Sequence, residues 1–136
     1  MIDKLKEECG VFGIFQNKDA SVLTQLGLHA LQHRGQEGAG IVSCDGNEFF
    51  SIRKKGLVSD NFNKLKTLKK LKGNSAIGHV RYSTAGGSTK ENIQPLFANL
   101  ADGGFACAHN GNLINANNLR EKLTKTGSIF QTTSDT

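Results

Sequence analysis

Four short segments of this sequence combine side chains that could attack, bind or stabilise a reacting group. Cys9 offers a thiol, whose thiolate attacks carbonyl carbons and creates an oxyanion that needs fixed hydrogen-bond donors. Asn110 and Gly111 offer such donors, and Arg81 offers a guanidinium, which grips a carboxylate well. Taken singly, each has an ordinary structural explanation: a buried free cysteine, a turn and a surface ion pair. The segments are Glu8–Ile14, Leu31–Gly40, Gly78–Gly86 and His109–Leu113.

Together and in this order, the four segments resemble the amidophosphoribosyltransferase family, and in particular its N-terminal glutaminase domain, a class II glutamine amidotransferase. The resemblance runs from about Glu8 to Thr136. It implies that Cys9 is the nucleophile and acts only as the first residue, with its own α-amine as the base. An α-amine has a reference pKa of about 8, whereas a peptide nitrogen is not basic. We therefore expect residues 1–8 to be a leader that is removed, and residues 9–136 to be the N-terminal portion of the amidotransferase domain.

The resemblance also implies roles for five further residues. The Asn110 side-chain amide and the Gly111 backbone N–H are expected to form the oxyanion hole. Arg81 is expected to bind the carboxylate of the substrate glutamine, and Asp135 its ammonium group. Thr84 is expected to add a hydroxyl contact from the loop that follows Arg81.

Arg34 and Gly35 match a family segment that lies near the active site and helps to order it. The residues themselves leave a second explanation open, because an arginine at a helix end and a glycine just beyond it also form a common helix C-terminus. The resemblance gives both residues a supporting role.

The reaction implied by the resemblance is hydrolysis of glutamine to glutamate and ammonia through a Cys9 thioester. In the family, a second domain uses the ammonia to convert phosphoribosyl pyrophosphate to 5-phosphoribosylamine, the first committed step of purine biosynthesis. That domain, with its Mg²⁺ and in some members an iron–sulfur cluster, is not represented in these 136 residues. We also expect a homo-oligomer that binds neither nucleic acid nor membranes. Residues 1–8 carry mixed charges and no apolar stretch typical of a secretory signal or transit peptide, so the expected compartment is the cytoplasm.

Two kinds of alternative remain at this point. Glucosamine-6-phosphate synthase, asparagine synthetase and glutamate synthase use a similar glutaminase domain. In a different class, the chain would be a non-catalytic module that binds an anionic ligand or nucleic acid. The lysine-rich run from Arg53 to Lys72 supports that second class, because it holds most of the net charge of +5 and such potential attracts polyanions.

Composition argues against membrane-spanning, disulfide-rich and metal-binding proteins. At 136 residues with 37% hydrophobic residues, the chain suits one domain with a core, and it has no apolar run long enough for a membrane-spanning helix. Three widely spaced cysteines suggest no disulfide framework. His29 and His33 are four residues apart, but no acidic ligand accompanies them, so no metal site is expected.

Hydrophobic patterns predict five or six strands and two clear helices. We expect a strand at 9–15 buried on both faces, hairpins at 40–52 around Asp45-Gly46 and at 96–109 around Asp102-Gly103-Gly104, and a strand at 75–82. A first helix follows an Asp19 or Ser21 cap and closes at Gly35, short helices carry the leucines of 59–72, and a final helix runs from Asn115 to Gly127. The resemblance implies an α+β, four-layer αββα N-terminal-nucleophile hydrolase fold, incomplete at its C-terminus.

Overall fold

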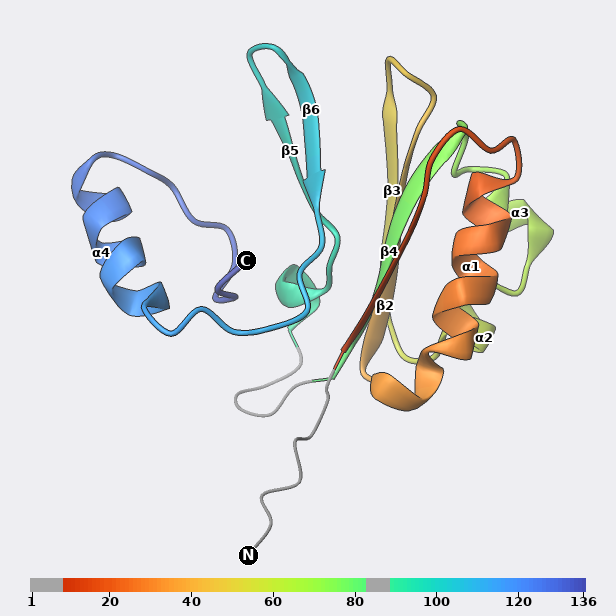
Figure 1. Ribbon diagram of the computed structural model, residues 1–136, viewed down its shortest axis with the longest axis horizontal. Helices are drawn as coiled ribbons and strands as arrows, with labels where there is room; N and C mark the ends of the chain where they lie inside the picture. Colours follow the sequence, from red (N-terminus) through yellow and green to blue (C-terminus); the bar gives the residue numbers. More distant parts are fainter. Residues whose placement is uncertain (1–8, 83–88) are drawn as a thin grey trace, which may run out of the picture.

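The computed structural model describes residues 9–82 and 89–136, and it is built on a four-stranded antiparallel sheet (Figure 1). The expected leader, residues 1–8, and Thr84 lie outside the described residues. The strand order is β1-β4-β2-β3. The strands are β1 (Gly10–Ile14), β2 (Gly38–Cys44), β3 (Phe49–Lys55) and β4 (Ser75–Arg81).

Alternation along these strands divides the sheet into two faces, because successive side chains of a strand point to opposite sides. On β4, Gly78 faces the helices, since a Cβ there would meet the side chain of Leu28 at 2.7 Å. His79 therefore lies on the opposite face, here called the inner face. The register pairs His79 with Val11 of β1 and with Gly40 of β2, so these positions share that face.

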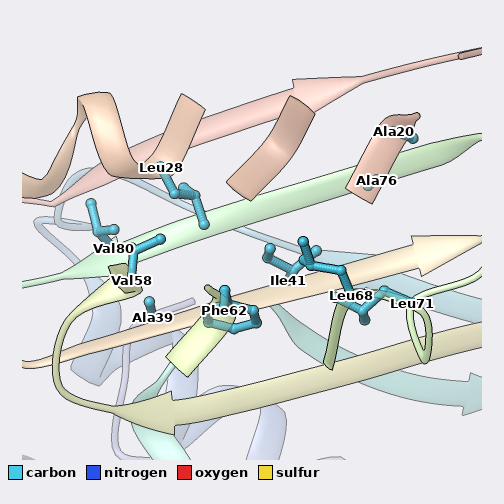
Figure 2. Close-up of a cluster of buried hydrophobic side chains, with 10 residues drawn as sticks. All are labelled: Ala20, Leu28, Ala39, Ile41, Val58, Phe62, Leu68, Leu71, Ala76 and Val80. Atoms are coloured by element: carbon cyan, nitrogen blue, oxygen red, sulfur yellow. The ribbon is translucent and has the colours of Figure 1, made fainter. Parts of the chain in front are cut away.

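Three helices cover the other face of the sheet, which contains the main hydrophobic core. They are α1 (Ala20–Ala30), α2 (Val58–Phe62) and α3 (Leu65–Leu68), all on one side of the sheet in Figure 1. Figure 2 shows Leu28 of α1 and Phe62 of α2 among the side chains that pack over Ile41 and Val80 of the strands. All four are fully buried.

The second sheet is a hairpin of β5 (Leu96–Leu100) and β6 (Gly103–Cys107), which lies on the inner-face side (Figure 1). It meets the first sheet through Phe49 and Phe97, whose ring centroids are 5.4 Å apart. Short 3-10 turns at Gln32–Arg34 and Lys90–Asn92 precede β2 and β5, and α4 (Ala116–Lys125) follows β6.

An apolar cavity of about 350 Å³ lies between the two sheets. Its lining includes Phe15, Val42, Phe49 and Ile77 of the first sheet region and Ala106 of β6. These residues belong to the end of the sheet where β1 and β2 finish, whereas Cys9 and Arg81 belong to the other end. The cavity is therefore remote from the expected chemistry.

Most of the expected elements are present, but three expectations were wrong in detail. The first strand is an edge strand with Val11 41% exposed, not one buried on both faces. The first helix ends at Ala30, so Gly35 does not close it; Gly35 instead follows the 3-10 turn Gln32–Arg34 in an extended conformation, at φ −167°. In the second hairpin, Leu100 pairs with Gly103, which places both glycines in β6 rather than in the turn.

The α+β class with two antiparallel sheets is confirmed. Asp19 stands before α1 and Asn115 before α4, but neither side chain makes a capping hydrogen bond. No helix in the described part of the chain has both the length and the apolar character needed to cross a membrane.

Candidate active site

Cys9 lies immediately before β1, where its sulfur makes two hydrogen bonds with the backbone of Tyr82. The Tyr82 N–H donates to the Cys9 Sγ at 3.3 Å. The Cys9 thiol in turn donates to the Tyr82 carbonyl oxygen, also at 3.3 Å. Cys9 has φ +68°, a left-handed conformation that is uncommon for residues other than glycine. Strained backbone of this kind collects at functional sites.

Arg34 holds the main chain of Cys9 from both sides. Its Nε donates to the Cys9 carbonyl oxygen at 2.6 Å, and its own carbonyl oxygen accepts from the Cys9 N–H at 3.0 Å. The 3-10 turn at Gln32–Arg34 brings the arginine to this position after α1 has ended. Arg34 is thus in direct contact with the candidate nucleophile.

Gly35 packs against the backbone of Arg81. A Cβ at Gly35 would lie 2.6 Å from the Arg81 carbonyl carbon, so no larger residue fits without moving β4. The glycine is needed for this close approach and not for a left-handed conformation. Gly35 still ends the 3-10 turn, with its N–H donating to the Gln32 carbonyl oxygen at 3.2 Å, but close packing is what requires a glycine here.

Arg81 is the last residue of β4 and projects from the inner face. Its Nη1 donates to the carbonyl oxygen of Asn92 at 3.0 Å, while its buried Nε has no hydrogen-bond partner among the described residues. An unpaired buried donor is costly, and a carboxylate ligand would satisfy it.

Asn110 and Gly111 follow β6 in an exposed loop. The Asn110 Nδ2 donates to the Cys9 carbonyl oxygen at 3.3 Å, although the two residues are 101 positions apart. Gly111 has φ +150°, and a Cβ there would lie 3.0 Å from the His109 ring. Glycine therefore lets this loop pass beside the histidine, with the Asn110 amide next to Cys9.

Asp135 is joined to the same loop. Its Oδ2 accepts from the Leu113 N–H at 2.6 Å. The residues around it are also held, because the Arg120 Nη2 of α4 donates to the carbonyl oxygens of Thr132 and Ser134 at 3.0 Å and 2.9 Å. Asp135 thus sits next to the loop of residues 108–115, here called the oxyanion loop because it carries Asn110 and Gly111, but no hydrogen bond joins Asp135 directly to Arg81.

His79 lies two residues before Arg81 on the inner face and is fully buried. Neither ring nitrogen has a partner at hydrogen-bond geometry within residues 9–82 and 89–136, although the nearby His109 backbone offsets part of the effect of burial on the pKa. Burial lowers the pKa of His79 from 6.5 to about 4, so the ring is neutral at cellular pH. The sequence did not distinguish this histidine from the other three.

Two residues that sequence reasoning missed complete the site region. Asn92 and Gln94 precede β5, each only 5% exposed, and their side chains hydrogen-bond to residues on the oxyanion loop and on the Asp135 segment. Their segment carries no charge and no nucleophile, so only its single proline, Pro95, was available as a signal.

Two further features of the described residues bear on the metal and binding-module alternatives. No cluster of three His, Cys, Asp or Glu residues that could hold a metal occurs within the described ranges. The lysines between Lys54 and Lys72 are exposed, and Lys72 lies over the Phe50 ring at 5.9 Å. The lysine-rich run is therefore a solvated face.

The geometry brings Cys9, Arg34, Gly35, Arg81 and Asn110 together through direct contacts or through one shared neighbour. Asp135 joins them through the loop that carries Asn110 and Gly111. The individual roles of these residues stay predictions.

Residues 66–136 match the model of a glutamine amidotransferase domain. That region contains Arg81, Asn110, Gly111 and Asp135, but not Cys9.

Curated relatives and solved structures point the same way. The chain is 58% identical to an amidophosphoribosyltransferase of Rhizobium etli over 98% of its length, and 54% identical to one of Lacticaseibacillus casei, of which it covers 68%. A solved structure of an allosteric regulatory enzyme of purine biosynthesis aligns with 92% of the chain at 52% identity and a TM-score of 0.87. The chain spans only 27% of the Rhizobium relative and 27% of that solved chain.

Proposed function

We propose, given that this chain belongs to the amidophosphoribosyltransferase family of glutamine amidotransferases, that its site hydrolyses glutamine and supplies the ammonia for the synthesis of phosphoribosylamine. The observation that carries the proposal is the contact between Asn110 and Cys9. It joins the expected oxyanion donor to the expected nucleophile across 101 positions of sequence. The relatives named above favour this function over glucosamine-6-phosphate synthase and similar enzymes, and over a basic binding module.

Removal of residues 1–8 would turn the Cys9 nitrogen from an amide into an amine. In the uncut chain this nitrogen donates to the Arg34 carbonyl oxygen at 3.0 Å. The same contact would hold the new amine beside the thiol of its own residue. Cleavage also abolishes the φ torsion of Cys9, so the strain of its left-handed conformation, on the order of 1–3 kcal/mol, would be relieved.

The reaction begins when the α-amine takes the proton of the Cys9 thiol. The thiolate attacks the side-chain amide carbon of glutamine, and the carbonyl oxygen becomes an oxyanion held by the Asn110 amide and the Gly111 N–H. The α-ammonium group then protonates the leaving nitrogen, ammonia departs and a Cys9 thioester remains. Water hydrolyses the thioester to glutamate and restores the thiol.

Two charged side chains, Arg81 and Asp135, would bind the charged groups of glutamine. Arg81 would bind the glutamine carboxylate, since its buried Nε has no hydrogen-bond partner among the described residues. Asp135 would bind the ammonium group, with its other oxygen held by the Leu113 N–H. Thr84, outside the described residues, would add a hydroxyl contact. Arg34 and Gly35 would keep Cys9 and Arg81 in place.

The proposal also covers the complete domain, the ligands bound outside these residues and the assembly. Residues 9–136 would form part of a four-layer αββα domain, in which the two sheets of this chain face each other. Phosphoribosyl pyrophosphate, Mg²⁺ and any iron–sulfur cluster would be bound outside these residues, in a cytoplasmic homo-oligomer.

The test is glutamine hydrolysis by the intact protein, after mass analysis has identified its first residue. We expect a chain that begins at Cys9 and releases glutamate and ammonia. Cys9→Ala should lose this activity by several orders of magnitude, about as much as other nucleophile deletions. Cys44→Ala is the matched control, because Cys44 is also a free cysteine but lies at the far end of β2.

Two results would count against the proposal. Glutamine hydrolysis that survives Cys9→Ala would mean that another group is the nucleophile. Full activity in a chain that still carries residues 1–8 would mean that the α-amine of Cys9 is not the base.

A further inference from the structure

The segment Asn92–Gln94 lies at the centre of the site region, although none of its residues has a role in the proposed chemistry. Asn92 and Gln94 are each 5% exposed. A buried side-chain amide costs free energy unless both its donor and its acceptor find partners. Both amides do find partners, and the partners belong to the elements that would bind glutamine.

The backbone of the segment rests on the inner face of the four-stranded sheet. Arg81 Nη1 donates to the Asn92 carbonyl oxygen and Arg53 Nη1 to the Ile93 carbonyl oxygen, each at 3.0 Å. The Gln94 carbonyl oxygen lies directly over Gly40, where an added Cβ would collide with it. The sheet therefore fixes the position of the segment.

The Gln94 side chain connects this fixed segment to the oxyanion loop. Its Oε1 accepts from the His109 N–H at 2.6 Å, and its Nε2 donates to Thr136 Oγ1 at 3.1 Å. His109 is the residue immediately before Asn110. Gln94 thus sets where the loop with the two oxyanion donors begins.

The Asn92 side chain connects the segment to the other half of the site. Its Nδ2 donates to Thr133 Oγ1 at 2.7 Å, and its Oδ1 accepts from the Thr133 N–H at 3.0 Å. Thr133 is two residues before Asp135. The amide thereby fixes the chain that presents the carboxylate expected to bind the substrate ammonium group.

We infer that Asn92 and Gln94 are positioning residues with separate tasks: Gln94 holds the oxyanion donors at the reacting carbonyl, and Asn92 holds the carboxylate that binds the substrate. The inference rests on the proposed glutaminase function. Oxyanion donors act mainly in the transition state, so their misplacement lowers kcat. The contact to the substrate ammonium group acts equally before and during the reaction, so its misplacement raises KM.

The test compares four variants of the intact protein in steady-state glutamine hydrolysis. Gln94→Leu removes both the acceptor for the His109 N–H and the donor to Thr136 Oγ1, which is next to Asp135. We expect kcat to fall roughly 10- to 100-fold, with a smaller rise in KM. Gln94→Glu keeps an acceptor at this position and should recover most of kcat. Asn92→Leu should raise KM for glutamine roughly tenfold with little change in kcat, and Asn92→Asp should reverse most of that rise.

Two controls separate positioning from general damage. The rate at which iodoacetamide alkylates Cys9, followed by peptide mass, needs no oxyanion hole and should stay near wild type in Gln94→Leu. Asn99→Leu makes the same kind of substitution at an exposed residue of β5 and should leave both kcat and KM unchanged.

The outcomes are distinguishable. Wild-type protein that hydrolyses glutamine while Gln94→Leu and Asn92→Leu keep normal constants would overturn the positioning roles alone. Equal changes of kcat and KM in both variants would overturn the division of tasks, as would a Gln94→Glu variant no better than Gln94→Leu. Wild-type protein that hydrolyses no glutamine would overturn the proposed function itself.

Discussion

On the helix-covered face of the four-stranded sheet, Ile41 and Val80 pack under Leu28 and are fully buried. On the inner face, the same strands carry Gly40 and Arg81, which seat a connecting segment and leave a donor available for a ligand. Because side chains alternate along a strand, one strand can serve both purposes. We expect variants on the helix-covered face to change stability, and variants on the inner face to change activity.

Of the variants that test this difference between the two faces, Leu28→Ala in α1 should have the largest effect. Leu28 is fully buried, so its truncation should lower the free energy of unfolding by about 2–5 kcal/mol while KM for glutamine stays the same. Leu26→Ala is the matched control in the same helix, because Leu26 is 55% exposed. Denaturant unfolding measures the free energy of unfolding of both variants. Equal losses of this free energy in Leu28→Ala and Leu26→Ala would contradict the assignment of the core to this face.

The next effect concerns the stability cost of a buried histidine on the inner face. His79 has its pKa lowered to about 4 by burial, against 6.5 in the unfolded chain. Between these values the unfolded chain binds the proton and the folded chain does not. The free energy of unfolding is therefore unaffected by this group above pH 6.5. As the pH falls from 6.5 to 4, His79 lowers the free energy of unfolding by about 3 kcal/mol.

His79→Gln removes this titration and should flatten the pH dependence by that amount. The measurement is the free energy of unfolding of both proteins from pH 4 to pH 8, compared as a difference because other groups titrate in the same window. Above about pH 7 the difference should be constant. A difference that is constant down to pH 4 would show that His79 is not buried in its neutral form.

The smallest of the three effects tests how the inner face seats the connecting segment. Gly40→Ala places a Cβ against the Gln94 carbonyl oxygen and should displace residues 92–94, lowering kcat/KM for glutamine about 100-fold. Gly13→Ala is the control on the same face, since its Cβ would meet Ile77 at an ordinary 3.6 Å. Similar kcat/KM values for the two variants would contradict the importance of this contact.

Sequence patterns were sufficient for most of the elements because these depend on neighbours in the chain. The β-prone runs on either side of Asp45-Gly46 form β2 and β3, and the leucines of 59–72 lie in or just after the short helix α3. The first helix was predicted too long, because Gly35 was interpreted as a cap when its role is to pack on Arg81. A glycine needed for close approach cannot be told from a capping glycine in the sequence.

The sequence by itself also determined the family, because four ordered motifs carry Cys9, Arg81 and Asn110. Only the tertiary structure decided how these residues are held. Arg34 clamps Cys9 across 25 positions, Asn110 reaches it across 101, and Gln94 supports His109 across 15. Such contacts depend on the packing of a connecting segment against a sheet, and no local spacing encodes that packing. For this reason the amides of Asn92 and Gln94 became visible only in the folded chain.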